Sequence, residues 1–157
     1  MQGHTKATVE PEELQKAVRL KIYELLLGSG SMPQVQSVAE TLGQPIEKVK
    51  EALMELRQKK SLVLMPQSGE ILMCQPWCAI PTPHVAHAGG RDWFAPCIWD
   101  VLAIPAAMGV PGSITTSCPC CGERMTSEVE HGKLLAGNGV VHIGLPAKQW
   151  WDDPFFT

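Results

Sequence analysis

The sequence has 157 residues, of which 45% are hydrophobic and 18% charged, and its formal net charge is -3 with a pI near 5.9. This composition is typical of a globular chain with one ordinary domain or two small ones. The slightly acidic balance gives no electrostatic reason to expect nucleic acid or an anionic membrane as a partner. No apolar run approaches the roughly 20 residues that span a bilayer, and the start of the chain lacks the features of a signal peptide. We therefore expect a cytoplasmic protein that does not enter a membrane.

The first half of the chain shows three helical patterns followed by a hairpin pattern. Apolar residues at helical spacing predict helices over residues 12–27, 33–42 and 45–60, each closed by glycine or by lysine. Residues 62–65 and 71–74 flank a Pro-Gln-Ser-Gly turn and predict two antiparallel strands. Three helices and a hairpin in this order are typical of a winged helix.

A winged-helix-like domain over residues 1–75 raises the question of DNA binding. The third predicted helix carries Glu47, Glu51 and Glu55 at successive i, i+4 steps, and DNA phosphates would repel this row. Residues 1–75 hold nine Lys plus Arg against nine Asp plus Glu, so this half is electrically neutral. Because a fold does not dictate its function, we expect a structural or dimerising role here and no DNA binding.

A Pro/Gly-rich linker is predicted over residues 76–90, with His84 and His87 as exposed loop histidines. Beyond it, over residues 91–157, the pattern predicts a small mixed α/β domain, so the fold class of the whole chain is α+β. Short strands are expected at residues 113–117, 125–130 and 139–145, the last one buried with His142 as a core histidine.

The stretch from Arg91 to Leu102 combines one thiol, one carboxylate and three large aromatic side chains. Pro96 suits the first turn of a helix, where backbone N–H groups and the helix dipole would favour a Cys97 thiolate. The i, i+3 spacing brings Asp100 onto the same face. We therefore expect Cys97 to be the most reactive thiol, beside a proton carrier. A buried free cysteine next to a surface aspartate fits the same residues, which leave both interpretations open.

Cys118 and Cys121 form a Cys-x-x-Cys-Gly turn, which is the pattern of half a structural zinc site. The other cysteine pair, Cys74 and Cys78, has a different spacing and lies before the predicted linker. A complete zinc ribbon is therefore less favoured than a turn with packed or reactive thiols. The crowding of Cys118, Cys120 and Cys121 favours thiol or metal chemistry in a reducing compartment over a disulfide framework.

Several stretches together resemble the alkylmercury lyase (organomercurial lyase) family, and the likeness extends from about residue 12 onward. They are Trp-Phe-Ala-Pro-Cys-Ile-Trp-Asp, Thr-Ser-Cys-Pro and the tail Val-His-Ile-Gly-Leu-Pro-Ala-Lys-Gln-Trp-Trp-Asp-Asp. The resemblance implies protonolysis of a carbon–mercury bond to a hydrocarbon and Hg(II), without an organic cofactor. It implies that Cys97 binds mercury as the nucleophile and that Asp100 is the catalytic carboxylate.

The chemistry that the resemblance implies suits the residues present. Mercury is a soft metal and thiolate is its preferred side-chain ligand, so the expected mercury ligands are Cys97 and, as further candidates, Cys118 and Cys121. The aromatic side chains of Trp93, Phe94 and Trp99 are expected to form an apolar wall for the organic group. The expected partners are a small organomercurial substrate and small thiols or a protein that handles mercuric ion.

One departure from the family pattern concerns a second thiol. The family uses two active-site cysteines, and the second lies in a segment near the place where this sequence stops at Thr157. We therefore expect either a truncated chain or a divergent member whose second thiol comes from elsewhere. The alternative functions are a non-catalytic soft-metal-binding module and a metal-sensing winged-helix protein.

Overall fold

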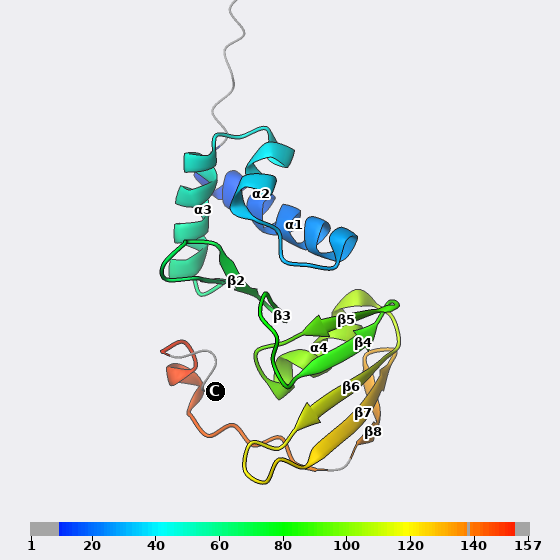
Figure 1. Cartoon of the computed structure of the whole chain (residues 1–157). Coiled ribbons are helices and arrows are strands. Elements are labelled where there is room, and N and C mark those ends of the chain that lie inside the picture. The colour runs from blue at the N-terminus through cyan, green and yellow to red at the C-terminus, as the bar shows by residue number, and fades with distance from the viewer. Residues whose placement is uncertain (1–9, 138, 153–157) are drawn as a thin grey trace, which may run out of the picture.

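In the computed structural model, which describes residues 10–137 and 139–152, the chain forms four α-helices and two antiparallel sheets. Figure 1 shows three helices at one end of the molecule and the larger sheet with the fourth helix at the other. The predicted α+β class is confirmed. No helix among the described residues is both long and apolar enough to cross a membrane.

The first half follows the predicted order of elements. The helices are α1 (Pro11–Ser29), α2 (Val35–Leu42) and α3 (Ile46–Gln58), and a glycine in the left-handed conformation ends each of the first two. Strand β1 (Val63–Leu64) pairs antiparallel with β2 (Ile71–Cys74), as expected for a hairpin. The apolar faces of these elements pack together in one core, which includes Val18, Ile22, Val38, Val49, Leu53, Leu62 and Ile71.

The glutamate row on α3 is partly paired with lysines of the same helix. Lys50 lies 3.0 Å from Glu47, and Lys48 lies 2.8 Å from Glu51. These are exposed pairs one turn apart, and they contribute little to stability. The absence of DNA binding remains a prediction.

The segment predicted as a linker contains regular structure. Within residues 76–90, β3 (Trp77–Cys78) pairs with β2, and β4 (Val85–Ala88) pairs with β5 (Arg91–Phe94). Its two glycines form the turn between β4 and β5, both with positive φ. The prolines and glycines of residues 76–90 do interrupt regular structure, as expected. The residues between them form short strands that belong to two different sheets.

The second sheet has five antiparallel strands in the order β5-β4-β6-β7-β8. The predicted strands at residues 113–117 and 125–130 are present as β6 (Gly112–Ser117) and β7 (Arg124–Glu130). Strand β8 (Lys133–Gly137) at the edge was not predicted. Helix α4 (Ile98–Met108) packs on β4, β6 and β7 and closes a second core, which includes Trp77, Ala86, Trp93, Val101, Ile104, Ile114 and Val129.

The prediction of a buried strand over residues 139–145 is wrong. This segment has no strand, Val140 is 91% exposed, and His142 is exposed and therefore not a core histidine. The edge position that such a strand would take is occupied by β8. The chain instead leaves the sheet and runs back toward the first half, ending in a short 3-10 helix, Ala147–Gln149 (Figure 1).

Candidate active site

Cys97 and Asp100 meet at the start of α4. Cys97 is the N-cap residue, in an extended conformation, and its Sγ accepts a hydrogen bond from the backbone N–H of Asp100 at 3.5 Å. In turn, the Cys97 thiol donates to Asp100 Oδ2 at 3.2 Å. The predicted pairing of thiol and carboxylate at i, i+3 is therefore present, with Cys97 one position before the first turn of the helix.

The predicted thiolate is not what this environment favours. Burial raises the pKa of Cys97 to about 11, and the neighbouring Asp100 carboxylate adds to the rise, while the backbone N–H groups of the helix start oppose it. Burial also raises the pKa of Asp100 above its ordinary value. The resting pair is therefore a neutral thiol hydrogen-bonded to a partly desolvated carboxylate, with one transferable proton between them.

A cavity of about 360 Å³ opens in front of this pair. Its walls come from three separate parts of the chain: the end of β2 with the following loop, the start of α4, and the tail after the second sheet. The lining residues are Met73, Gln75, Cys97, Ile98, Trp99, Asp100, Ile143, Trp150 and Trp151. A small apolar ligand would thus contact the thiol and the carboxylate inside a mostly apolar enclosure.

Only one of the three aromatic residues predicted as substrate wall lies in this cavity. Trp99 lines it and is 63% exposed. Trp93 is 3% exposed, packs edge-on against Trp77, and donates from Nε1 to the Ala88 carbonyl oxygen at 2.9 Å. Phe94 is half-buried and does not contribute to the lining. Trp93 and Phe94 belong to β5 and point to opposite faces of its sheet, whereas Trp99 belongs to the first turn of α4 beside Cys97.

The cavity also contains residues that the sequence did not single out as site residues. Trp150 and Trp151 belong to the tail used for the family resemblance, and the pair of adjacent tryptophans was the available signal. Trp150 is held by a hydrogen bond from Nε1 to the Leu145 carbonyl oxygen at 2.9 Å. Gln75 is fixed from the first core, since Tyr23 donates to its carbonyl oxygen at 3.0 Å. No local pattern in the sequence could have placed Gln75 here.

The remaining cysteines lie in two different environments. Cys74 and Cys78 are buried in the paired strands β2 and β3, and burial raises the pKa of Cys78 to about 11. Cys118 is partly exposed at the tip between β6 and β7, and hydrogen bonds from the backbone N–H groups of Cys121 and Cys120 lower its pKa. Across residues 10–137 and 139–152, no three Cys, His, Asp or Glu side chains have the geometry to hold a metal ion together.

The two histidines expected in a linker loop lie beside and within β4. His84 is half-buried, its Nδ1 lies 2.7 Å from Thr116 Oγ1, and burial lowers its pKa, which favours the neutral ring. His87 is exposed and pairs with Asp92 across the hairpin. Both side chains have sheet partners, and neither lines the cavity around Cys97.

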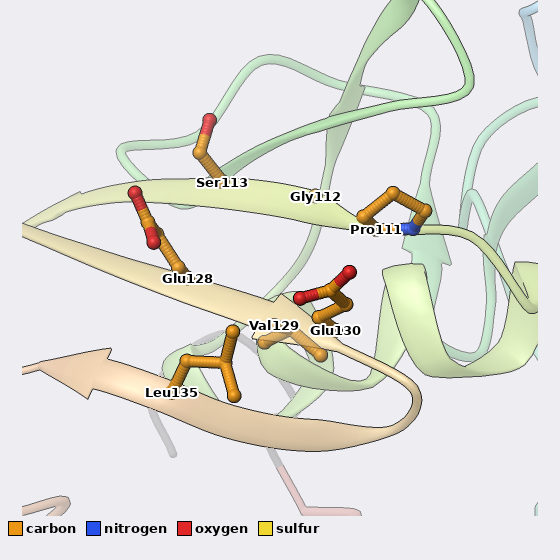
Figure 2. A pocket seen from close by; sticks show the side chains of 7 residues that line it. All are labelled: Pro111, Gly112, Ser113, Glu128, Val129, Glu130 and Leu135. Atoms are coloured by element: carbon orange, nitrogen blue, oxygen red, sulfur yellow. The ribbon is translucent and has the colours of Figure 1, made fainter.

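A second hollow lies over β6, β7 and β8 of the large sheet (Figure 2). Its polar side chains are Ser113, Glu128 and Glu130, and Leu135 of β8 forms the apolar side. Carboxylates and a hydroxyl are hard donors, and the lining includes no thiol. This hollow is therefore a poorer match to a soft metal than the cavity at Cys97.

Comparisons with known proteins identify the class to which this site belongs. Residues 78–155 match the family model described as alkylmercury lyase. Alkylmercury lyases of Bacillus cereus and Clostridium butyricum are each 30% identical over 124 residues, which is 77% of this chain and 55% of theirs. The predicted resemblance to the alkylmercury lyase family is thereby confirmed, and residues 78–155 carry its sequence pattern. The chain spans about half the length of these curated relatives.

The fold is similar to that of a solved relative. The crystal structure of the mercury-bound form of MerB2 aligns with a TM-score of 0.59 and 23% identity, covering 80% of this chain and 67% of that one. At this identity the likeness shows a shared fold. What the Cys97–Asp100 pair does in this chain has to be argued from its own geometry.

Proposed function

We propose that this chain captures organomercurials at Cys97 and cleaves their carbon–mercury bond by protonolysis with Asp100 as the proton carrier. The observation that carries the proposal is the hydrogen bond from the Cys97 thiol to Asp100 Oδ2 at the edge of an apolar cavity. The family resemblance supports the reaction class, since the matched relatives are named alkylmercury lyases.

The first step would be exchange of sulfur ligands on mercury. An organomercurial bound to a small thiolate presents mercury to Cys97 Sγ. The bond from Cys97 sulfur to mercury forms as the bond to the small thiolate breaks and that thiolate leaves, while the thiol proton of Cys97 passes to Asp100 Oδ2. The pair of neutral thiol and carboxylate suits this step because the carboxylate already accepts that hydrogen bond. Burial raises the pKa of Asp100, which favours its holding the proton until the carbon receives it.

The second step would transfer that proton to carbon. The electron pair of the carbon–mercury bond becomes the new carbon–hydrogen bond, the hydrocarbon leaves, and mercury stays as Hg(II) with no change of oxidation state. Cys97 and the sulfur of the small thiol then hold the metal. In this proposal a small thiolate rejoins the metal as its second ligand, and no organic cofactor takes part.

The cavity would favour this reaction by excluding water around the leaving group. Its walls of Trp99, Trp150 and Trp151 are suited to a methyl or phenyl group, and partial desolvation strengthens the interaction between the carboxyl proton and carbon. Free thiols at Cys97 and elsewhere suit a reducing compartment such as the cytoplasm.

The test is to incubate the chain with phenylmercury or methylmercury and an excess of a small thiol, and to measure benzene or methane. We expect hydrocarbon release that Cys97→Ser abolishes. Cys120→Ser serves as the matched control because its thiol is exposed and lies outside the lining of the cavity. Stoichiometric mercury capture without hydrocarbon would instead identify a binding module and overturn the enzymatic proposal.

A further inference from the structure

We propose that the tip between β6 and β7 is a second soft-metal site, in which the Sγ atoms of Cys118 and Cys121 together bind one Hg(II) ion. This site uses neither Cys97 nor Asp100, so the proposal can be tested independently of the proposed lyase reaction. The tip lies at the end of the large sheet that points away from α1, α2 and α3 (Figure 1).

The hairpin holds the two thiols together. The backbone N–H of Cys118 donates to the Glu123 carbonyl oxygen at 2.8 Å, and the N–H of Gly122 donates back to the Cys118 carbonyl oxygen at 2.8 Å. Gly122 has a φ of 74°, a conformation that glycine adopts without strain. Within this turn the Cys121 thiol is a hydrogen-bond partner of the Cys118 sulfur.

The turn also fixes the position of the Cys118 sulfur. The backbone N–H groups of Cys120 and Cys121 are hydrogen-bond partners of its Sγ, so the sulfur is held in place before any metal arrives. Soft cations prefer such sulfur ligands to oxygen or nitrogen. A two-sulfur site falls short of the four ligands of structural zinc, but it satisfies Hg(II), which is stable with two thiolates.

The binding step is a simple ligand exchange. Two S–H bonds break, two S–Hg bonds form, two protons pass to solvent, and the oxidation states of mercury and sulfur do not change. The pair is accessible for this exchange, since Cys118 is partly exposed and Cys121 exposed. Cys74 and Cys78 are buried, so they are poor competitors for an ion that arrives from solution.

The experiment uses the full chain in a Cys97→Ser background, reduced and freed of reductant. Mercuric chloride is titrated against it in the presence of a competing small monothiol, with native mass spectrometry and sulfur-to-mercury charge-transfer absorption as readouts. We expect one ion per chain. Adding Cys118→Ser and Cys121→Ser should weaken binding on the order of 100-fold, because a tethered pair gains from effective concentration.

Cys120→Ser is the matched control, since it removes a neighbouring exposed thiol and leaves the pair and the backbone intact. It should retain the bound ion. Equal binding after loss of both Cys118 and Cys121, or equal weakening by Cys120→Ser, would overturn the proposal. So would a pair that readily forms a disulfide but, once reduced, holds mercury no better than the competing monothiol. Far-ultraviolet circular dichroism of each variant should match the parent, because these side chains lie at a surface tip.

Discussion

At Cys97, burial and the helix terminus act on the same thiol in opposite directions. The N–H groups at the start of α4 favour the thiolate, and this local effect is visible in the sequence as Pro96 followed by Cys97. Burial favours the thiol and is the larger effect, but it depends on tertiary structure around the start of α4. The position of the pair could therefore be predicted, whereas its resting protonation state could not.

The first prediction concerns which thiol reacts first. With limiting iodoacetamide at neutral pH, we expect the peptide that carries Cys118 to be alkylated before the peptide that carries Cys97. The rate at Cys97 should rise about tenfold per pH unit toward its pKa of about 11, because only the thiolate reacts. Peptide mapping by mass spectrometry measures both. Preferential labelling of Cys97 at neutral pH would contradict its raised pKa and would support the thiolate that the sequence predicts.

A second prediction separates two tryptophans that the sequence placed in the same role. Trp93→Ala removes a side chain that is 3% exposed, and it should cost about 3–5 kcal/mol in the free energy of unfolding. Trp99→Ala removes a side chain that is 63% exposed and should change stability by about 0.5 kcal/mol or less. Urea denaturation checks both values. Similar losses for the two variants would contradict the assignment of Trp93 to the core and Trp99 to the cavity.

Elements whose apolar residues recur at a regular spacing could be predicted from the sequence. Elements whose position depends on pairing with another segment could not. The three helices carry apolar residues every three or four positions, and β6 and β7 flank a recognisable turn. Strand β8 contains no such signal, because its register depends on pairing with β7. Residues 139–145 have the composition of a strand, but they pair with no strand of the sheet, so the local pattern alone misleads here.

The packing of α4 on the sheet gives a prediction at this scale. A Cβ added at Gly112 would lie 2.7 Å from Pro105 Cγ and 3.0 Å from the His87 carbonyl oxygen. Gly112→Ala should therefore push helix and sheet apart and cost about 1–3 kcal/mol in the free energy of unfolding.

Gly28→Ala in α1 is the matched control for that substitution. A Cβ there meets no atom within 4 Å, so the variant should gain about 0.5–1 kcal/mol from helix propensity. Urea denaturation of both variants provides the measurement. A Gly112→Ala protein as stable as the parent would mean that α4 does not approach the sheet this closely.

At the scale of the whole molecule, the site depends on contacts between segments far apart in the sequence. The family resemblance drew attention to Cys97, Asp100 and the tail, but the contribution of Met73 and Gln75 follows from the way β2 and β3 approach α4. A catalytic region confined to residues 91–157 would lack this wall. The two cores also meet, since the partly buried side chains of Tyr23 and Met32 pack against both.

The buried thiols predict how the stability of the molecule depends on pH. Burial raises the pKa of Cys78 and Cys97 from 9.0 to about 11 and that of Tyr23 to about 12. Above pH 9 the unfolded chain therefore binds fewer protons than the native chain, so the free energy of unfolding should fall as pH rises toward 11. Urea midpoints under reducing conditions measure this. A smaller decline for Cys78→Ala would confirm the cause, and a flat profile between pH 8 and pH 11 would contradict it.

The most direct measurement of the proposed reaction compares Asp100→Asn with the parent chain in a single turnover. Each protein is mixed with equimolar phenylmercury and a small thiol, and mercury retained on the protein is measured alongside benzene released. We predict that Asp100→Asn captures mercury to the same final extent as the parent, because Cys97 is unchanged and its thiol proton can pass to solvent. It should release benzene about 10²- to 10⁴-fold more slowly, because an amide cannot relay the proton to carbon. Benzene release at the parental rate, or loss of capture together with release, would contradict the assignment of Asp100 as the proton carrier.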